Sequence, residues 1–261
     1  MGDERERDDI DPGRSMRLLW RIQVAPKRGP KQSLTTDQIV TAAIEVADAE
    51  GFAAISMRRV AKRLGVGAMS LYTYVPSKSD LLALMFDRVV GDYDISFPED
   101  AAWRDRLEMI ARAQWDLYRD HRWMGHMPAT RVPLGPNLLD SYERSAAAIS
   151  GLGLTGKEMT EVLNLVSSYV RGAVRLAVEA ATLPLVHAMD DEDWWAGVGL
   201  VLGAVWDPAR FPTLSSAEMA HAWDQDDDEQ GFFMAEAVAS FEFGLARVLD
   251  GVEAFIEQRK S

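Results

Sequence analysis

The sequence predicts an all-α protein in which a small N-terminal helical domain precedes a larger helical domain. Three observations support this fold class. Apolar residues recur at intervals of three and four, helix start and stop signals separate these segments, and no segment alternates strictly between apolar and polar residues as a β-strand does. Hydrophobic residues make up 48% of the 261 residues, which is enough for a substantial core. We therefore expect helices packed on helices throughout.

Charge divides the chain into the same two parts. Residues 12–88 contain 12 Lys and Arg against 6 Asp and Glu, whereas residues 89–261 contain 14 against 29. A basic head on an acidic body is typical of a DNA-binding module joined to a separate regulatory domain. Solvated helices produce the same asymmetry by chance about as often, so the charge alone leaves both interpretations open.

Composition excludes several classes of protein. The absence of cysteine excludes disulfides, thiolate metal ligands and cysteine nucleophiles, and it is typical of a reducing cytoplasm. The N-terminal MGDERERDDID lacks the apolar core of a signal peptide, and no apolar run reaches ~18 residues, so no membrane partner is expected. The four histidines lack metal-ligand spacing, and the GxGxxG match at residues 151–156 follows a predicted helix instead of a strand. We expect no metal site, no cofactor and no catalytic residue.

The first 33 residues are expected to form a flexible basic arm. Pro26, Gly29 and Pro30 prevent regular structure in its second half, and residues 16–24 could form a short helix before them. The basic side chains could extend into a minor groove of DNA or belong to a solvated tail without specific contacts. They are Arg17, Arg21, Lys27, Arg28 and Lys31.

Residues 34–80 carry the signals of a three-helix domain. Thr35 opens a capping box before the first helix. Ser56 is expected to cap the second helix and Gly65 to end it, and a third helix should follow over residues 68–75.

The remaining residues, 81–261, are expected to form the larger domain. Prolines and glycines predict loops at residues 122–137 and 207–231. Apolar spacing predicts helices at about residues 77–90, 103–121, 137–150, 157–182, 190–206 and 232–257.

The most informative segment is residues 56–75, SMRRVAKRLGVGAMSLYTYV. It joins a short basic helix, a Gly-Val-Gly turn and a second helix that begins with small residues. A helix-turn-helix needs this order, because the N-terminal residues of its second helix must reach base edges in the major groove. Tyrosine and threonine hydroxyls and rings suit phosphates and thymine methyl groups. The alternative is that Tyr72 and Tyr74 are ordinary packing aromatics.

With the preceding AAIEVADAEGFAAISMRRVA, the segment LGVGAMSLYTYVPSKSDLL strongly resembles the TetR family of bacterial repressors. The body resembles the tetracycline-repressor subclass in HRWMGHMPATRVPLGPNLLDSYE, SYVRGA and FEFGLARVLDGVEAFI. The likeness covers about residues 34–258. It implies a bacterial cytoplasmic protein with nine or ten helices that dimerises through its last long helices. It also implies double-stranded operator DNA and a small-molecule effector as partners.

The resemblance also implies roles for single residues. Arg58 would contact a base, and Ser56 would contact a phosphate at a helix N-terminus. Tyr72 and Lys78 would hold phosphates. The residues at the start of the second helix would face bases, and they are Ala68, Met69, Ser70, Thr73 and Tyr74, preceded by the turn residue Gly67. The family commonly has a hydrogen-bonding side chain where this chain has alanine, so the operator sequence cannot be carried over.

A polar stripe at helical spacing marks the otherwise apolar helix at residues 157–182. The stripe consists of Asn164, Ser168, Arg171 and Arg175. It is either a solvent face or a cavity wall, and the central place of this helix in the family fold favours a ligand cavity. The other expected wall residues are Trp115, Tyr118, Trp123, Met127, Arg131 and Tyr142. A cationic cavity lined by aromatic side chains suits a flat ligand with carboxylate or phenolate groups.

Two functions remain for this combination. The favoured one is a ligand-responsive transcriptional repressor that binds operator DNA as a dimer. A small aromatic, anionic effector would release it, for example to derepress an efflux or antibiotic resistance gene. The alternative is a constitutive DNA-binding regulator without an inducer. The chain has no GxSxG, HExxH or P-loop motif, so an enzyme is not expected.

Dimerisation is expected through the helix at residues 190–206 and the C-terminal helix. The C-terminal helix carries an apolar stripe that is longer than the core of one subunit needs. Its members are Phe241, Leu245, Val248, Val252 and Ile256.

Overall fold

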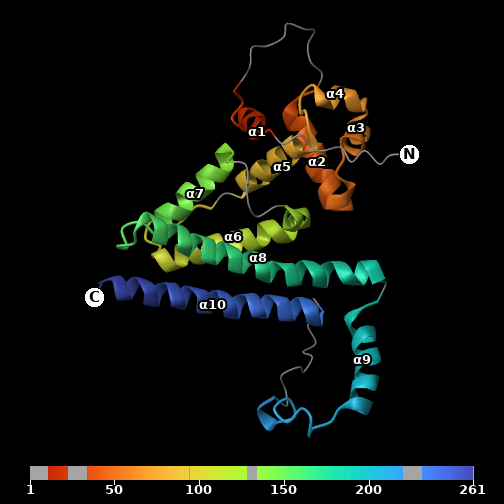
Figure 1. Ribbon diagram of the computed structural model, residues 1–261, viewed down its shortest axis with the longest axis vertical. Coiled ribbons are helices and arrows are strands. Elements are labelled where there is room, and N and C mark those ends of the chain that lie inside the picture. Colours follow the sequence, from red (N-terminus) through yellow and green to blue (C-terminus); the bar gives the residue numbers. More distant parts are fainter. Residues whose placement is uncertain are drawn as a thin grey trace.

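The computed structural model describes residues 11–22, 34–93, 95–127, 134–187, 189–219 and 231–260, apart from the side chains of residues 183–187, 218 and 260. The described residues form α-helices and short 3-10 helices without a β-strand, so the predicted all-α fold is confirmed (Figure 1). The α-helices are α1 (Pro12–Leu19), α2 (Thr36–Glu50), α3 (Met57–Leu64), α4 (Ala68–Tyr72), α5 (Lys78–Asp92), α6 (Trp103–Asp120), α7 (Pro136–Ala148), α8 (Gly156–His187), α9 (Asp191–Val205) and α10 (Phe232–Lys260). The 3-10 helices are η1 (Phe52–Ala54), η2 (Arg122–His126) and η3 (Ala217–Met219). None of the described helices is long and apolar enough to span a membrane.

Local capping signals start and stop the helices of the head, α2 to α4. Thr35 Oγ1 accepts the Gln38 backbone N–H at 3.1 Å while the Gln38 side chain accepts the Thr35 N–H at 2.9 Å, which completes the predicted capping box. Ser56 Oγ accepts the Arg59 N–H at 3.2 Å and so begins α3. Gly65 ends α3 in the left-handed conformation, with φ of 69°. These short-range hydrogen bonds explain why the first two helices could be predicted from the sequence.

The third helix of the head is shorter than predicted. It ends at Tyr72, and the N–H groups of Tyr74 and Val75 both donate to the Leu71 carbonyl, at 2.9 and 2.8 Å. The chain turns here because the residue before Pro76 is disfavoured in the helical conformation.

The body is built from α6, α7, α8 and α10. α8 and α10 lie side by side, and α9 extends away from them (Figure 1). The expectation that the apolar stripe of α10 forms the dimer interface is wrong for four of its five members. Phe241, Leu245, Val252 and Ile256 are at most 2% exposed within a single chain. α10 uses this stripe to pack on α6 and α8 of its own subunit.

The helix α5 joins the head to the body. Its N-terminal half packs in the head core, where Leu81 and Met85 are completely buried. Its C-terminal half contacts α7, and Asp87 accepts the Leu138 backbone N–H at 3.0 Å. A displacement of α5 therefore moves the head relative to the body.

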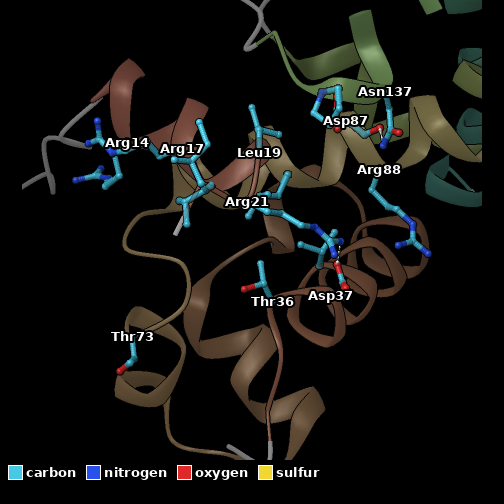
Figure 2. A pocket seen from close by; sticks show the side chains of 15 residues that line it. Arg14, Arg17, Leu19, Arg21, Thr36, Asp37, Thr73, Asp87, Arg88 and Asn137 are labelled. Carbon is cyan, nitrogen blue, oxygen red and sulfur yellow. Dashed lines mark hydrogen bonds and ion pairs between the residues drawn. The ribbon is translucent and has the colours of Figure 1, made fainter. Parts of the chain in front are cut away.

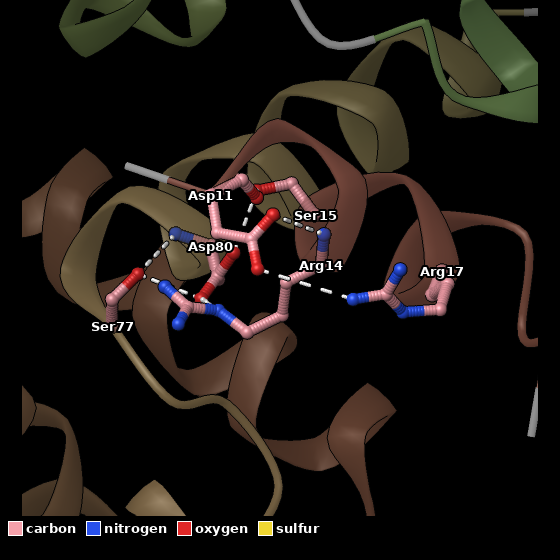
Figure 3. Close-up of polar contacts among 6 residues, drawn as sticks. All are labelled: Asp11, Arg14, Ser15, Arg17, Ser77 and Asp80. Carbon is pink, nitrogen blue, oxygen red and sulfur yellow. Dashed lines mark hydrogen bonds and ion pairs between the residues drawn. The ribbon is translucent and has the colours of Figure 1, made fainter. Parts of the chain in front are cut away.

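The prediction of a flexible arm is wrong for residues 12–19, which form α1 and pack on α5 (Figure 3). Asp11 caps this helix by accepting the Arg14 N–H at 3.0 Å. The side chain of Asp80 on α5 is 1% exposed. It accepts a hydrogen bond from Ser15 Oγ at 2.6 Å and another from Arg14 Nε at 2.8 Å. The sequence pattern missed this because Asp80 is far away along the chain. Lys27, Arg28 and Lys31 lie outside the described residues.

Two further contacts tie the end of α1 to the head and to the body. Arg21 forms an ion pair with Asp37 on α2, with a distance of 2.9 Å between its Nη2 and the carboxylate Oδ1. Trp20 Nε1 donates to the carbonyl of Leu134, just before α7, at 2.9 Å. α1 therefore bridges the two parts of the protein.

We expect Asp80→Ala to release α1. Loss of the buried carboxylate should leave Ser15 and Arg14 without their strongest acceptor, and lower the free energy of unfolding by about 1–3 kcal/mol. Trypsin should then cleave after Arg17 faster than in the wild-type protein. Asp92→Ala, an exposed position on the same helix, serves as the control and should change neither quantity appreciably. Equal cleavage rates and equal stability for Asp80→Ala and wild type would contradict the docking of α1.

Candidate nucleic-acid interface and effector cavity

The start of α4 presents an exposed surface at the tip of the head. Met69 is 78% exposed, which is unusual for a large apolar side chain. Ser70 and Thr73 are exposed as well, whereas Ala68 is half-buried. An apolar contact from an exposed side chain suits a thymine methyl group in the major groove. Met69, Ser70 and Thr73 are therefore accessible to DNA, as their predicted contacts with bases require.

The two tyrosines of this segment contribute to packing. Tyr72 and Tyr74 are half-buried and lie against the apolar core of the head. The alternative interpretation, that Tyr72 and Tyr74 are packing aromatics, therefore holds for their rings. Their predicted contacts with phosphate and base stay predictions.

Arg58 differs from the other arginines of α3. Arg59 is hydrogen-bonded to Glu50 with an Nε–Oε2 distance of 2.8 Å, and Arg63 to Glu45 with an Nη2–Oε2 distance of 2.7 Å. Arg58 is exposed, and among the residues that the structure describes no carboxylate lies within ion-pair distance of it. Its guanidinium is available for a base edge or a phosphate.

Lys78 and Ser56 each make a contact within the head. Lys78 is the first residue of α5, and its Nζ lies 5.5 Å from the centre of the Phe52 ring. Such a cation–π contact holds the ammonium at the surface of the head. Ser56 uses its Oγ as the N-cap acceptor of α3. Both residues lie at helix N-termini, where the helix dipole favours a phosphate group.

Two hollows adjoin each other along α8. The smaller has a volume of about 180 Å³ and lies between α5, α6, α7 and α8. The larger has a volume of about 860 Å³ and is lined by the end of α2, by η2 and by α8. Tyr118, Met124 and Arg171 line both hollows. Tyr118 and Arg171 were predicted to do so, and Met124 was not. Of the remaining predicted residues, Trp123, Met127 and Arg175 line the larger hollow, and Tyr142 and Asn164 line the smaller.

Arg171 lies where the two hollows meet. It is half-buried, and no carboxylate of the described residues forms an ion pair with it. Burial raises the pKa of the nearby Tyr118, the positive charge of Arg171 opposes this shift, and Tyr142 adds to it. Tyr118 therefore keeps its proton near neutral pH and can donate a hydrogen bond. Arg175 differs, because its exposed side chain donates to Glu179 at 2.8 Å.

Two described residues that were predicted to line the cavity, Trp115 and Ser168, do not line these hollows. Trp115 is buried in the core of the body, where it stacks on Phe241 of α10 with 4.1 Å between the ring centres, because α6 packs on α10 as well as on α8. Ser168 is exposed on α8 and lines neither hollow. Arg131 lies outside the described residues.

Most of the lining of the larger hollow was not predicted from the sequence, and three of these residues could take part in ligand binding. Arg122, His126 and Phe52 line it, and the His126 ring stacks on Phe52 with 5.5 Å between centres. The first two belong to the segment that supplied Trp123 and Met127, so their proximity along the chain was the available signal.

Two family models together match most of the chain. The model described as "Bacterial regulatory proteins, tetR family" matches residues 39–85, and "Tetracyclin repressor-like, C-terminal domain" matches residues 97–256. The chain belongs to the TetR family. It is 37% identical over 254 residues to the HTH-type transcriptional repressor DrrR1 of Streptomyces coeruleorubidus. The alignment covers 96% of this chain and 88% of that protein. This TetR-family repressor thus combines a helix-turn-helix head with a ligand-binding C-terminal domain.

Solved structures give the same result. Apo ActR from Streptomyces coelicolor has a TM-score of 0.68 and 27% identity, covering 88% of this chain and 99% of that one. ActR in complex with actinorhodin has a TM-score of 0.67 at 27% identity, covering 86% and 99%. A variant of TetR from Acinetobacter baumannii in complex with minocycline shares the fold, with a TM-score of 0.58 at 20% identity and coverage of 85% and 98%. TetR-family repressors bind DNA, dimerise and bind small-molecule ligands.

The predicted DNA contacts of Arg58 and Lys78 imply different effects for Arg58→Ala and Lys78→Ala. The operator duplex for this test is selected from a random pool with the wild-type protein. Arg58→Ala should reduce the difference in binding free energy between this duplex and random DNA by about 1–3 kcal/mol. Lys78→Ala should weaken binding to both duplexes alike and lower the magnitude of the slope of log K against log salt concentration by about one. Fluorescence anisotropy titrations at several salt concentrations measure both effects. The same loss on both duplexes for Arg58→Ala would contradict a base contact.

Proposed function

We propose that this repressor binds operator DNA as a homodimer and is released by a small aromatic, anionic effector that occupies the two adjoining hollows. Release would derepress a target gene, for example one for efflux or resistance. The observation that carries the proposal is Arg171, a half-buried cation without a described carboxylate partner. A partly desolvated guanidinium gains from an anionic ligand, because a charged group away from water needs a partner.

The lining of the hollows supports an aromatic ligand. The aromatic side chains of Tyr118, Phe52 and His126 line the larger hollow, and the hydroxyl of Tyr118 offers a donor. The volume of about 860 Å³ falls in the range of sites for drug-sized ligands. The similar TetR family protein ActR has been solved in complex with actinorhodin, which makes that compound the first probe to test.

The position of the larger hollow supports release of DNA by the effector. Residues at the end of α2 line one side of it and residues of α8 line the other, so it lies between head and body. A ligand that favours one separation of these elements favours one orientation of the head. The two heads of a dimer must lie about 34–36 Å apart to enter successive major grooves, so a small reorientation disfavours operator binding.

We expect Arg171→Ala to weaken release by actinorhodin while leaving operator affinity of the free protein nearly unchanged. Loss of a charge-assisted hydrogen bond of about 1.5–3 kcal/mol should raise the concentration of actinorhodin needed for half-release by about tenfold or more. Arg175→Ala removes an arginine side chain one turn further along α8. It should have a smaller effect, because Arg175 already pairs with Glu179. Gel-shift titrations measure the half-release concentration. An unchanged value for Arg171→Ala would contradict the assignment of the cavity.

The exposed apolar face of α9 supports dimerisation. None of its residues is buried in a single chain, and Leu200 and Val205 are 81% and 65% exposed. Phe243 on α10 is 68% exposed. Soluble proteins rarely leave such apolar patches uncovered. A second copy of the chain would cover them, and it would use a face of α10 other than the predicted stripe.

We expect Leu200→Glu and Phe243→Glu each to weaken the dimer by about tenfold or more, because a charge would be buried in an apolar interface. Leu139→Glu places the same charge on the exposed part of α7 and serves as the control. Sedimentation equilibrium at micromolar concentration measures the association, with circular dichroism to check the fold. A wild-type monomer, or two variants as dimeric as the control, would contradict this interface.

A further inference from the structure

A third hollow lies between α1 and the head, and arginines line one side of it. It has a volume of about 790 Å³ and is lined by residues of α1, α2, α5 and α7 and by Thr73 just after α4. Arg14 and Arg17 on α1, together with Arg21 just after this helix, lie above Thr36 and Thr73 in the view of Figure 2. None of the residues that line this hollow lines the two hollows along α8. We call it the α1 groove.

The α1 groove adjoins the surface of the head that is predicted to face DNA. Thr73 lines the groove and is one of the exposed residues predicted to contact bases. α1 lies at the same end of the molecule as α3 and α4, away from α8 and α10 (Figure 1). Double-stranded DNA carries one negative charge for about every 1.7 Å of its axis, so a duplex that meets α4 also brings phosphates past its neighbours. Cations on α1 are therefore placed to meet the backbone beside α4.

The packing of α1 on α5 decides which of its side chains remain accessible. Ser15 and Leu19, four residues apart, are buried. Arg17 lies between them in the sequence, and its side chain is 51% exposed. Arg21 follows four residues later, with a side chain that is 76% exposed. Because the helix is already held in place, its arginines meet DNA without the entropy cost of ordering a free arm.

Arg14 and Arg17 differ in how firmly a carboxylate holds them. Arg14 Nε donates to the buried Asp80 at 2.8 Å, so this arginine anchors α1. Arg17 Nη2 lies 3.9 Å from Asp11 Oδ2, which is too long for a hydrogen bond. Exposed ion pairs of this kind contribute little to stability. Arg17 can therefore exchange its contact with Asp11 for a phosphate oxygen at little cost.

Arg21 has a different role, because its partner also lines the α1 groove. Arg21 Nη2 lies 2.9 Å from the Asp37 carboxylate, which is 57% exposed. An unpaired carboxylate at this position would repel a phosphate group. The ion pair removes most of that repulsion from the path of the DNA strand.

We propose that α1 is an additional DNA-contacting element, in which Arg17 binds a backbone phosphate beside the segment that α4 contacts and Arg21 neutralises Asp37. The proposal rests on operator binding by the head. The family model of the head matches residues 39–85, so α1 adds a contact from outside the matched segment. A phosphate contact carries no sequence information by itself. It raises affinity for all DNA and widens the region that each head covers.

The salt dependence of binding tests the Arg17 contact. Arg17→Gln should lower the magnitude of the slope of log K against log salt concentration by about one for each subunit in contact, on operator and random duplexes alike. Arg17→Lys keeps the charge and should retain the slope. Lys157→Gln removes a charge from the exposed start of α8 and should change neither slope nor affinity appreciably. Anisotropy titrations measure the slopes, and circular dichroism checks the fold.

A structural role for Arg17 predicts a different result. Asp11→Asn removes the charge that pairs with Arg17 but keeps an oxygen that can cap α1. Under the proposal this variant should not weaken DNA binding. Equal losses of affinity for Asp11→Asn and Arg17→Gln would show that Arg17 acts through the ion pair, and would overturn the proposal.

Ethylation interference locates the phosphate. Ethylation removes the charge of a single phosphate, so it blocks binding where the protein contacts that phosphate. Arg17→Gln should lose interference at one phosphate in each half-site, at a position different from the one lost in Lys78→Ala. Identical interference patterns for the wild-type protein and Arg17→Gln would overturn the contact.

A double-mutant cycle tests the role of Arg21. Asp37→Asn should strengthen DNA binding more in the Arg21→Gln background than in the wild-type background, because only there is the carboxylate unpaired. Equal effects of Asp37→Asn in the two backgrounds would overturn this role.

Random DNA separates failure of the α1 contact from failure of operator recognition. If the wild-type protein selects no operator from a random pool, sequence recognition by the head fails. The α1 contact is then tested on a random duplex, which presents the same phosphates. A lower slope for Arg17→Gln on that duplex supports the contact, and an unchanged slope overturns it.

Discussion

The helix α5 belongs to two cores at once, and this constraint governs the rest of the structure. Its first turns complete the apolar core of the head, and its last turns pack on α7 in the body. Asp80 near its beginning holds α1, and Asp87 near its end holds α7. A rigid helix that is shared in this way cannot satisfy both cores in more than a few orientations. The orientation of the head is therefore tied to the state of the body, which a ligand-responsive repressor requires.

Electrostatics divides the basic residues of the head between stability and DNA binding. Arg59 and Arg63 on α3 are held by Glu50 and Glu45, so much of their charge is used within the head. Arg58, on the same helix, is exposed without such a partner among the described residues. The net charge of a basic segment therefore overestimates what it offers to DNA. The arginines that remain available matter more than their total number.

Local signals in the sequence predicted the helices, and long-range packing decided what the sequence could not predict. The capping box at Thr35 and the N-cap at Ser56 involve partners three residues away, so their pattern is readable in one chain. The docking of α1 depends on Asp80, which lies 65 residues after Ser15. In the candidate site, Arg171 was found because its stripe follows the helical period, whereas Trp115 was misplaced because periodicity does not say which face of α6 meets α8 and which meets α10.

If effector and operator act on one shared equilibrium of this repressor, each must weaken the binding of the other, and reciprocity tests this most directly. Isothermal titration of actinorhodin into the wild-type protein, with and without saturating operator duplex, gives two affinities for the same cavity. Operator should lower the affinity for actinorhodin by the same factor by which actinorhodin lowers the affinity for operator. Binding of actinorhodin with equal affinity to the free and the DNA-bound repressor would contradict it.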